Sequence, residues 1–303
     1  DESVPEQYRK LIKSCWEEDP RKRPTFKEIV SMLKTDKSFI TKKINEREFL
    51  KVVEEFDNMN HEYHDLYFDK VHIDYKEGKE LHVDLVETNL KFYDLHEKVG
   101  EGQYGEVFQV IDIRKNSIYA AKVNRLHIED CKYDQLKCLE REIKILSKLK
   151  SPLILKFIGF NRNDFDGEPR PTIITEFIKN MSLDKIIKLV NCGRKPKEWD
   201  DTKLLIVTYG IAAGMSHLHS LNILHRDLKP ENVFLDEHLF PKIGDFGLSK
   251  EIEEDDRFTQ SKSNVGTPAF MAPEIFESFN YTKASDVYAF GILLYEITTF
   301  DLP

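Results

Sequence analysis

The fold of this chain is decided by two stretches of sequence, His225-Arg226-Asp227-Leu228-Lys229-Pro230-Glu231-Asn232 and Asp245-Phe246-Gly247. A carboxylate at Asp227 can accept the proton of an attacking hydroxyl group, and Lys229 can neutralise charge on a phosphoryl group during its transfer. Asn232 and Asp245 carry the hard oxygen ligands that Mg²⁺ prefers. The two stretches therefore predict a centre for phosphoryl transfer. The alternative interpretation is an ordinary polar loop beside a buried pair of strands.

The segment between these stretches predicts a hairpin. Residues 233–235 and 240–243 have the composition of short strands, and the polar turn Asp236-Glu237-His238 joins them. Such a hairpin would bring Asn232 and Asp245 to the same end, where both can face one metal ion.

The bulk composition limits the classes of protein. The chain has 303 residues, of which 40% are hydrophobic and 33% charged, so it can form one large or two modest domains and is not a disordered chain. A net charge of -9 predicts no nucleic-acid partner and no anionic-membrane partner. The four cysteines form no C-x-x-C pair, which argues against a zinc site or a disulfide framework. Reduced thiols fit a cytoplasmic protein.

The sequence carries no membrane or export signal. No apolar run approaches the roughly 20 residues of a membrane span, and no signal peptide precedes the first predicted helix. Because the chain begins at Asp1 rather than Met, we expect it to be a segment of a longer protein.

Residues 3–34 predict two helices that need a partner surface. Ser3 with Glu6, and Thr25 with Glu28, have the spacing of capping boxes at two helix starts. One apolar stripe per helix follows, formed by Tyr8, Leu11, Ile12, Cys15 and Trp16 and by Phe26, Ile29, Val30 and Leu33. A pair this short cannot bury both stripes alone.

Residues 36–91 are charged and are interpreted as a connector. Within it, Asn45 and Glu48 are expected to open a helix whose inward side chains are Phe49, Val52, Val53 and Phe56.

A glycine-rich turn lies between two predicted strands. Residues 92–99 and 107–110 read as strands, and Gly100-Glu101-Gly102-Gln103-Tyr104-Gly105 joins them. The glycines allow the backbone to approach phosphate groups closely. A G-x-G-x-x-G pattern also fits a dinucleotide-binding fold, but there a helix should follow. The strand that follows here favours a hairpin over the phosphates of a nucleotide.

Lys122 lies in a third predicted strand, residues 117–123, among small and apolar residues. An ammonium group in such a strand needs an anionic partner. The predicted helix 135–149 offers Glu142, with Glu140 as the alternative.

Two further strands, 154–160 and 172–177, lead into a predicted joint between two lobes at residues 175–178. Main-chain groups of Glu176 and Ile178 could meet the edge of an adenine there, whereas the alternative is an edge strand leaving a sheet. Asp200 then caps a long helix that leads to His225.

The ordered set of motifs resembles the eukaryotic protein kinases over residues of about 92–303. The set comprises the glycine-rich turn, the Ala-Ala-Lys strand, the two opening stretches, Ala272-Pro273-Glu274 and Asp286-Val287-Tyr288-Ala289-Phe290-Gly291. The resemblance implies an α+β, bilobal protein kinase fold, with a small antiparallel β N-lobe that carries one helix and a mainly helical C-lobe. The expected parts are a helix pair at 1–35, a helical and charged linker at 36–91, the N-lobe at 92–178 and an incomplete C-lobe at 179–303.

The resemblance also implies the cofactors ATP and Mg²⁺ and the role of each site residue. Asp227 orients the substrate hydroxyl with Lys229 beside it, Lys122 holds the ATP phosphates with Glu142, and Asn232 and Asp245 bind Mg²⁺. Thr175 falls at the gatekeeper position. The nucleotide site is implied to comprise Val99, Gly100, Gly102, Gly105, Val107, Ala120, Lys122, Thr175, Glu176, Ile178 and Phe234. Residues 229–231 and 266–268 resemble serine/threonine kinases, and the Cys15-Trp16 helix pair resembles the tail of the tyrosine-kinase-like group.

The order of parts departs from the family, because the helices that resemble the end of a C-lobe precede the kinase body. A tandem array of kinases and a circular permutation both fit this order. If the helices of residues 3–34 did not cover it, the helix that begins near Asp286 would expose an apolar stripe formed by Val287, Phe290, Leu294 and Ile297. We therefore expect residues 3–34 to dock on the C-lobe of the same chain, with Arg23 paired to Glu274. A swapped dimer is the alternative.

Two functions fit the sequence. The first is a serine/threonine kinase that transfers the γ-phosphoryl group of ATP to a protein hydroxyl, and the second is a non-catalytic binding module or scaffold. The charged residues that catalysis needs are all present, which favours the first. Phosphorylation of Thr259, Ser261 or Ser263 is expected to order the neighbouring segment by pairing with Arg226.

Overall fold

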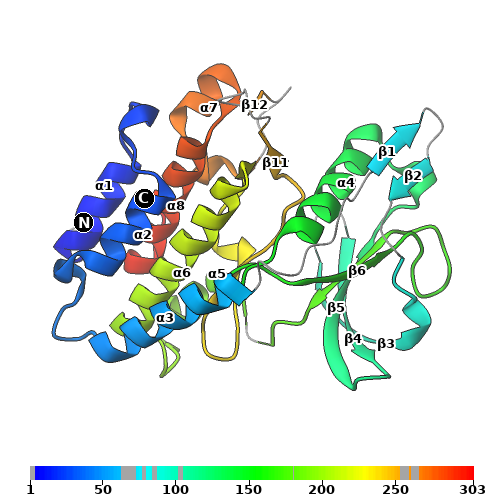
Figure 1. Cartoon of the computed structure of the whole chain (residues 1–303), viewed down its shortest axis with the longest axis horizontal. Helices are drawn as coiled ribbons and strands as arrows, with labels where there is room; N and C mark the ends of the chain where they lie inside the picture. The colour runs from blue at the N-terminus through cyan, green and yellow to red at the C-terminus, as the bar shows by residue number, and fades with distance from the viewer. Residues whose placement is uncertain are drawn as a thin grey trace. The chain divides into compact units, whose positions relative to one another are not determined.

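The computed structural model describes residues 4–62, 73–76, 80–83, 87–101, 105–179, 181–252, 259–260 and 266–303 (Figure 1). The chain forms two compact units. The first unit contains Asp1–Tyr63, Ser151–Ile154 and Lys179–Pro303, and the second contains His64–Lys150 and Leu155–Ile178.

The second unit is built on one antiparallel sheet. Its strands lie in the order β3 (Tyr93–Glu101), β4 (Gly105–Asp112), β5 (Ser117–Asn124), β7 (Thr172–Glu176) and β6 (Phe157–Asn161). The helix α4 (Tyr133–Lys148) lies between β5 and β6 in the chain, and β1 (Ile73–Lys76) pairs with β2 (Glu80–Val83) as a separate ribbon. A core of Leu90, Tyr93, Val110, Ala121 and Ile174 is buried in this unit.

One predicted strand is shorter than expected. The strand predicted at 154–160 begins only at Phe157, because the preceding residues bond to a different element. Ile243 donates its N–H to the Leu153 carbonyl at 2.8 Å, and Ile154 forms an isolated parallel bridge with Ile243. A stretch of apolar residues cannot by itself show which of two partners its backbone will take.

The first unit is mainly helical. Its body contains α5 (Leu183–Asn191), α6 (Asp201–Ser220), α7 (Pro273–Ser278) and α8 (Lys283–Thr299). The described residues of this unit also form three short strand pairs, namely β8 (Ile223–Leu224) with β11 (Lys250–Glu251), β9 (Val233–Leu235) with β10 (Pro241–Ile243), and β12 (Thr259–Gln260) with β13 (Asn280–Tyr281). The Asp200 side chain accepts a hydrogen bond from Lys203 N–H, so the predicted cap of α6 is confirmed.

Helices from the start of the chain cover this body. They are α1 (Glu6–Cys15), α2 (Phe26–Thr35) and α3 (Glu46–Glu62), with short 3₁₀ turns at Pro20–Lys22 and Lys37–Phe39. Figure 1 draws α1 and α2 in blue, and they contact α8 and α6 respectively. The predicted capping box of α2 is present, since Thr25 N–H donates to Glu28 Oε2 at 2.7 Å and Glu28 N–H to Thr25 Oγ1 at 3.3 Å. Ser3 lies outside the described residues, and α1 begins after Pro5 without a side-chain cap.

The close approach of α1 to α8 depends on Gly291. A Cβ atom at this position would lie 2.7 Å from both Cys15 Cβ and Trp16 Nε1, which is too short for two atoms in contact. The Trp16 ring lies 5.7 Å from that of Tyr295, and Phe26 stacks edge-on against Phe290 at 5.4 Å. The apolar stripe of α8, formed by Val287, Phe290, Leu294 and Ile297, is buried, and each side chain is at most 2% exposed.

Part of the predicted connector, residues 36–91, packs against the first unit. Its expected helix is present as α3. Phe49 of α3 packs against Tyr209 of α6 at 5.8 Å, and Phe56 packs against Phe240, directly before β10, at 5.3 Å. Lys34 Nζ lies 2.7 Å from Asp57 Oδ2 and ties α2 to α3. Residues 46–62 therefore belong to the packed first unit. Among the helices that the structure describes, none is long and apolar enough to cross a membrane.

Candidate active site

The loop that contains Asp227 is anchored to α8 by one buried carboxylate. Asp286 accepts the N–H groups of His225 and Arg226, both at 2.9 Å, and His219 Nε2 lies 2.9 Å from the same carboxylate. Burial opposes ionisation of Asp286, but the hydrogen bond and charge of His219, the charge of His225 and the Arg226 N–H hold its pKa below the usual value. These bonds fix the backbone at Arg226, which has a positive φ of 65°.

The Asp227 carboxylate is held by neighbours on both of its oxygen atoms. Oδ1 accepts the N–H of Thr267 at 2.9 Å and its hydroxyl at 2.8 Å. Oδ2 accepts Asn232 Nδ2 at 3.1 Å and lies 2.9 Å from Lys229 Nζ. Lys229 also donates to Thr267 Oγ1 at 2.8 Å. Thr267 and Asn232 donate hydrogen bonds to the carboxylate, and Lys229 lies beside it. These contacts fix the orientation of Asp227, in which it can accept a proton.

Thr267 is the member of this set whose role the sequence analysis missed. Its position depends on Gly266, which has a φ of +107°. A Cβ atom at Gly266 would lie 2.5 Å from the Arg226 carbonyl oxygen, so only glycine lets this segment approach the Asp227 loop. The Gly-Thr-Pro pattern at 266–268 is the sequence signal that could have indicated this contact.

The two candidate metal ligands lie at one end of a hairpin, as the sequence predicts. Strands β9 and β10 pair antiparallel from Val233↔Ile243 to Leu235↔Pro241, and Gly244 N–H donates to the Asn232 carbonyl at 2.9 Å. Asn232 directly precedes β9, and Asp245 follows β10. The backbone of Asp245 has a positive φ of 59°. An amide and a carboxylate fit Mg²⁺, which takes few protein ligands and completes its shell with phosphate and water oxygens. Among the described residues, no group of three or more His, Cys, Asp or Glu side chains could hold a metal ion.

The second unit contains the predicted lysine pair. Lys122 Nζ on β5 lies 2.6 Å from Glu142 Oε1 and 2.8 Å from Oε2 on α4. Glu142, rather than the alternative Glu140, is thus the carboxylate at this position, and it is 7% exposed. A bidentate contact of this kind holds the ammonium group in place at the face of the sheet.

The residues predicted to contact the nucleotide are spread over β3, β4, β5 and β7. Gly100 pairs with Val107, Val107 with Lys122, and Ala120 with Thr175. A Cβ atom at Gly105 would lie 2.4 Å from the Val123 carbonyl oxygen, so a larger residue would disturb the sheet. Val99 is exposed on β3, and Gly102 lies outside the described residues.

The predicted adenine-binding segment follows directly from β7. Thr175 is 9% exposed, and its hydroxyl donates to the Glu176 carbonyl at 3.2 Å. Glu176 donates its N–H to the Lys156 carbonyl at 2.9 Å, so that N–H group is already used within the sheet. Ile178 is the last residue of the second unit. Phe234 lies on β9 of the first unit, where it pairs with Lys242.

The comparison with known proteins gives the family. The family described as protein kinase domain matches residues 93–303, which is more than half of the chain. This chain belongs to the protein kinase family. The kinase chain is 33% identical over 230 residues to the serine/threonine-protein kinase CTR1 of Arabidopsis thaliana, covering 75% of this chain and 26% of that protein.

Other relatives of this kinase are also named as serine/threonine kinases. It is 34% identical over 226 residues to AtPK1/AtPK6 of Arabidopsis thaliana, covering 73% of this chain and 45% of that protein. It is 32% identical over 202 residues to the putative serine/threonine-protein kinase A of Trypanosoma brucei brucei, covering 66% of this chain and 44% of that protein. This chain therefore carries a kinase domain of the serine/threonine class and spans less than half the length of these relatives.

Proposed function

We propose that this kinase is a catalytically competent, ATP- and Mg²⁺-dependent enzyme that transfers the γ-phosphoryl group of ATP to serine or threonine hydroxyls of protein substrates. The observation that carries the proposal is the set of contacts on Asp227. A carboxylate that accepts from Thr267 and Asn232 and lies beside Lys229 is oriented for one task. A binding module without catalysis would have no need for this arrangement.

The proposed reaction assigns one task to each residue. The substrate hydroxyl oxygen attacks the γ-phosphorus, the bond from that phosphorus to the bridging oxygen of ADP breaks, and the hydroxyl proton passes to Asp227. Lys229 places its positive charge beside the transferred group. Lys122, positioned by Glu142, holds the α- and β-phosphates. Asn232 and Asp245 would hold Mg²⁺, which neutralises phosphate charge when it is bound.

The nucleotide site is proposed from the residues of the second unit and from Phe234. Gly100, Gly102 and Gly105 allow the backbone to approach the phosphates, and Val107 and Ala120 provide the apolar surface for the adenine ring. Val99 and Phe234 extend that surface. The carbonyl of Glu176 and the main chain of Ile178, beside the gatekeeper Thr175, are the groups proposed to hydrogen-bond the adenine edge.

The experiment that tests the proposed function measures transfer of labelled phosphate from γ-labelled ATP to a mixed Ser/Thr protein substrate such as casein. The expected result is Mg²⁺-dependent labelling of serine and threonine, and none of tyrosine, after acid hydrolysis. Absence of transfer by a folded chain that binds Mg-ATP would favour the scaffold function instead.

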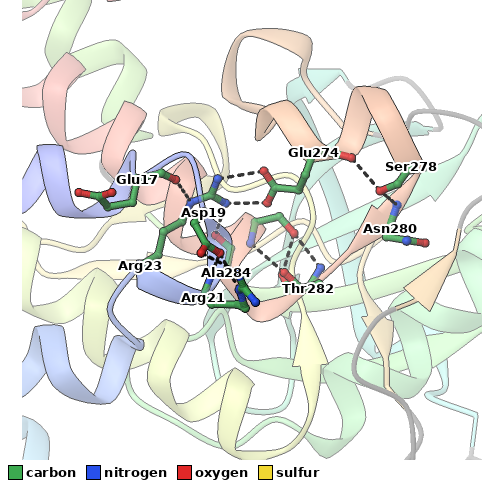
Figure 2. A network of polar contacts seen from close by, with 10 residues as sticks. Glu17, Asp19, Arg21, Arg23, Glu274, Ser278, Asn280, Thr282 and Ala284 are labelled. Carbon is green, nitrogen blue, oxygen red and sulfur yellow. Dashed lines mark hydrogen bonds and ion pairs between the residues drawn. The ribbon is translucent and has the colours of Figure 1, made fainter.

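We also propose that residues 3–34 act as closing helices of the C-lobe within the same chain. The support is the contact of Arg23 with Glu274, at 2.6 and 2.9 Å, which joins residues far apart in sequence (Figure 2). Arg23 further donates to the carbonyls of Glu17 and Ala284, and its guanidinium lies 5.1 Å from the centre of the Tyr288 ring. We expect light scattering at micromolar concentration to show a monomer. A dimer that separates only on unfolding would instead support a dimer in which residues 3–34 are swapped between two chains.

We propose residues 1–35 as the helix pair, 36–91 as the linker, 92–178 as the N-lobe and 179–303 as the C-lobe. Within the linker, α3 packs on the first unit. A cytoplasmic location is proposed because the spacing of the four cysteines predicts no disulfide framework, which fits a reducing compartment. Fractionation of cells that express a tagged chain tests the location. Recovery of the chain with disulfide-bonded secreted proteins would contradict it.

A further inference from the structure

A groove of about 480 Å³ lies where the docked helix pair meets α6 and α8. One wall comes from Pro20–Lys27, between and at the start of the N-terminal helices, and the other from the C-terminal turn of α6 and the first turn of α8. Its volume falls within the range of about 300 to 1,000 Å³ that is typical of ligand pockets. Figure 2 labels Arg21, Arg23 and Ala284, which belong to the lining of this groove.

The surface of the groove is mostly apolar. Pro24, Phe26, Ala284 and Val287 form its floor and sides, and small Ser216 leaves space beside them. Phe26 and Val287 are at most 2% exposed, so the floor is a continuation of the packed core. A rigid apolar floor of this kind fits one bulky side chain of a binding partner.

The charged residues that line the groove are all cationic. Among the described residues that line it, there is no carboxylate. Arg21 and Arg23 are neutralised by Asp19 and Glu274. Lys27 has no ion-pair partner in the described part of the chain and is exposed. The groove therefore presents positive charge on a chain whose net charge is -9.

Lys283 has lost hydration without gaining a counter-charge. It is half-buried at the start of α8, and its Nζ donates to the neutral Asn222 Oδ1 at 2.8 Å. Burial lowers the pKa of Lys283, and no carboxylate of the described residues offsets that effect. An anion in the groove would restore the missing attraction, because an opposite charge nearby favours the charged form of a lysine.

We propose that this groove is a docking site for an acidic peptide segment of a partner protein. A bulky apolar side chain of the segment enters between Pro24 and Val287, and flanking carboxylates face Lys27 and Lys283. The net charge of -9 disfavours acidic segments on the chain as a whole, so the two lysines would direct them to this groove. The inference rests on the docking of residues 3–34 proposed above, because that segment supplies one wall.

The test uses fluorescence anisotropy of the full chain with a labelled synthetic peptide that has aspartates on both sides of a central phenylalanine. We expect saturable binding that weakens with added salt, since the two lysines are within reach of solvent. Replacing the aspartates by lysines should abolish binding, and replacing the phenylalanine by alanine should weaken it at least tenfold. Equal binding of all three peptides overturns the proposal.

Variants of the chain locate the binding to the groove. Lys27→Glu should weaken binding at least tenfold, and Ser216→Trp should block the groove to a similar extent. Lys13→Gln removes an exposed lysine of α1 outside the groove and should leave affinity unchanged. Loss of binding in Lys13→Gln, or full binding in both groove variants, contradicts the assignment. Because Lys27 is exposed and unpaired, its replacement does not threaten folding.

Competition and mass measurements separate the other occupants. Displacement of the peptide by free phosphate or aspartate at equal concentration would identify a small-anion site and overturn the peptide proposal. A mass that doubles with chain concentration and excludes the peptide would identify a second copy of the chain instead. A failure of the proposed docking of residues 3–34 is recognised by a different measurement. In that case Arg23→Met would leave the free energy of unfolding unchanged.

Discussion

The most informative perturbation of the docked helices is Arg23→Met. The Arg23 side chain is fully buried and Glu274 is 20% exposed, so methionine keeps most of the apolar packing while leaving a partly buried carboxylate without its partner. Removing one partner of a buried pair costs about 3 to 5 kcal/mol. Partial hydration of Glu274 shifts the expected value to the lower end, about 3 kcal/mol of unfolding free energy.

The assay follows tryptophan fluorescence during urea unfolding. Both tryptophans of the chain, Trp16 and Trp199, lie in the first unit, and Trp16 packs on Tyr295 of α8. A Trp199→Phe background makes Trp16 the single reporter of the contact between α1 and α8. Comparing Arg23→Met with Glu274→Gln and with the double variant gives the coupling between the two residues, expected at about 1 to 3 kcal/mol.

Arg21→Met is the matched control. Arg21 pairs with Asp19 in a neighbouring position, but its side chain is 89% exposed, so the unfolding midpoint should not move. Additive effects of Arg23→Met and Glu274→Gln, or an unfolding midpoint that rises with chain concentration, would refute docking within one chain.

Three further predictions test packing, ionisation and switching. Gly291→Leu should lower the unfolding free energy by about 1 to 3 kcal/mol in urea titrations, because a Cβ there already overlaps α1. Burial and nearby carboxylates raise the pKa of Glu296 to about 7 from 4.5, so stability should fall as pH rises from 4.5 to 7, and Glu296→Gln should remove that fall in pH-dependent melting curves. Alanine at Thr259, Ser261 and Ser263 together should lower transfer activity, and mass spectrometry after incubation with Mg-ATP should find phosphate in the unreplaced chain. Unchanged activity of the triple variant would rule out activation through these hydroxyls.

Much of the fold followed from local sequence signals. The Thr25 and Asp200 caps, the β9–β10 hairpin and the strand that carries Lys122 each depend on residues a few positions apart, which a single sequence displays. The preference for Glu142 over Glu140 as the partner of Lys122 was also confirmed. The family resemblance added the pairing of Arg23 with Glu274, which no local pattern contains.

The features that were missed depend on contacts between distant segments. The packing of α3 on α6 requires knowing that Phe49 meets Tyr209, and the late start of β6 requires knowing that Leu153 bonds to β10. The contact of Thr267 with Asp227 likewise depends on a backbone approach that Gly266 permits. A single sequence shows which residues are present but not which distant residues come into contact in the fold.

The measurement that tests the central claim most directly compares two aspartate variants in binding and in transfer. Asp227→Asn should lower phosphoryl transfer by about 10² to 10⁴-fold while leaving the affinity for Mg-ATP nearly unchanged, because Asp227 serves the attacking hydroxyl. Asp245→Asn should lose Mg-ATP affinity as well, as a metal ligand must. Calorimetric titration gives the affinity, labelled-phosphate transfer gives the rate, and the tryptophan unfolding midpoint checks that both variants are folded. Equal Mg-ATP affinity in the two folded variants, or transfer by Asp227→Asn at the rate of the unreplaced chain, would contradict the assignment of the site.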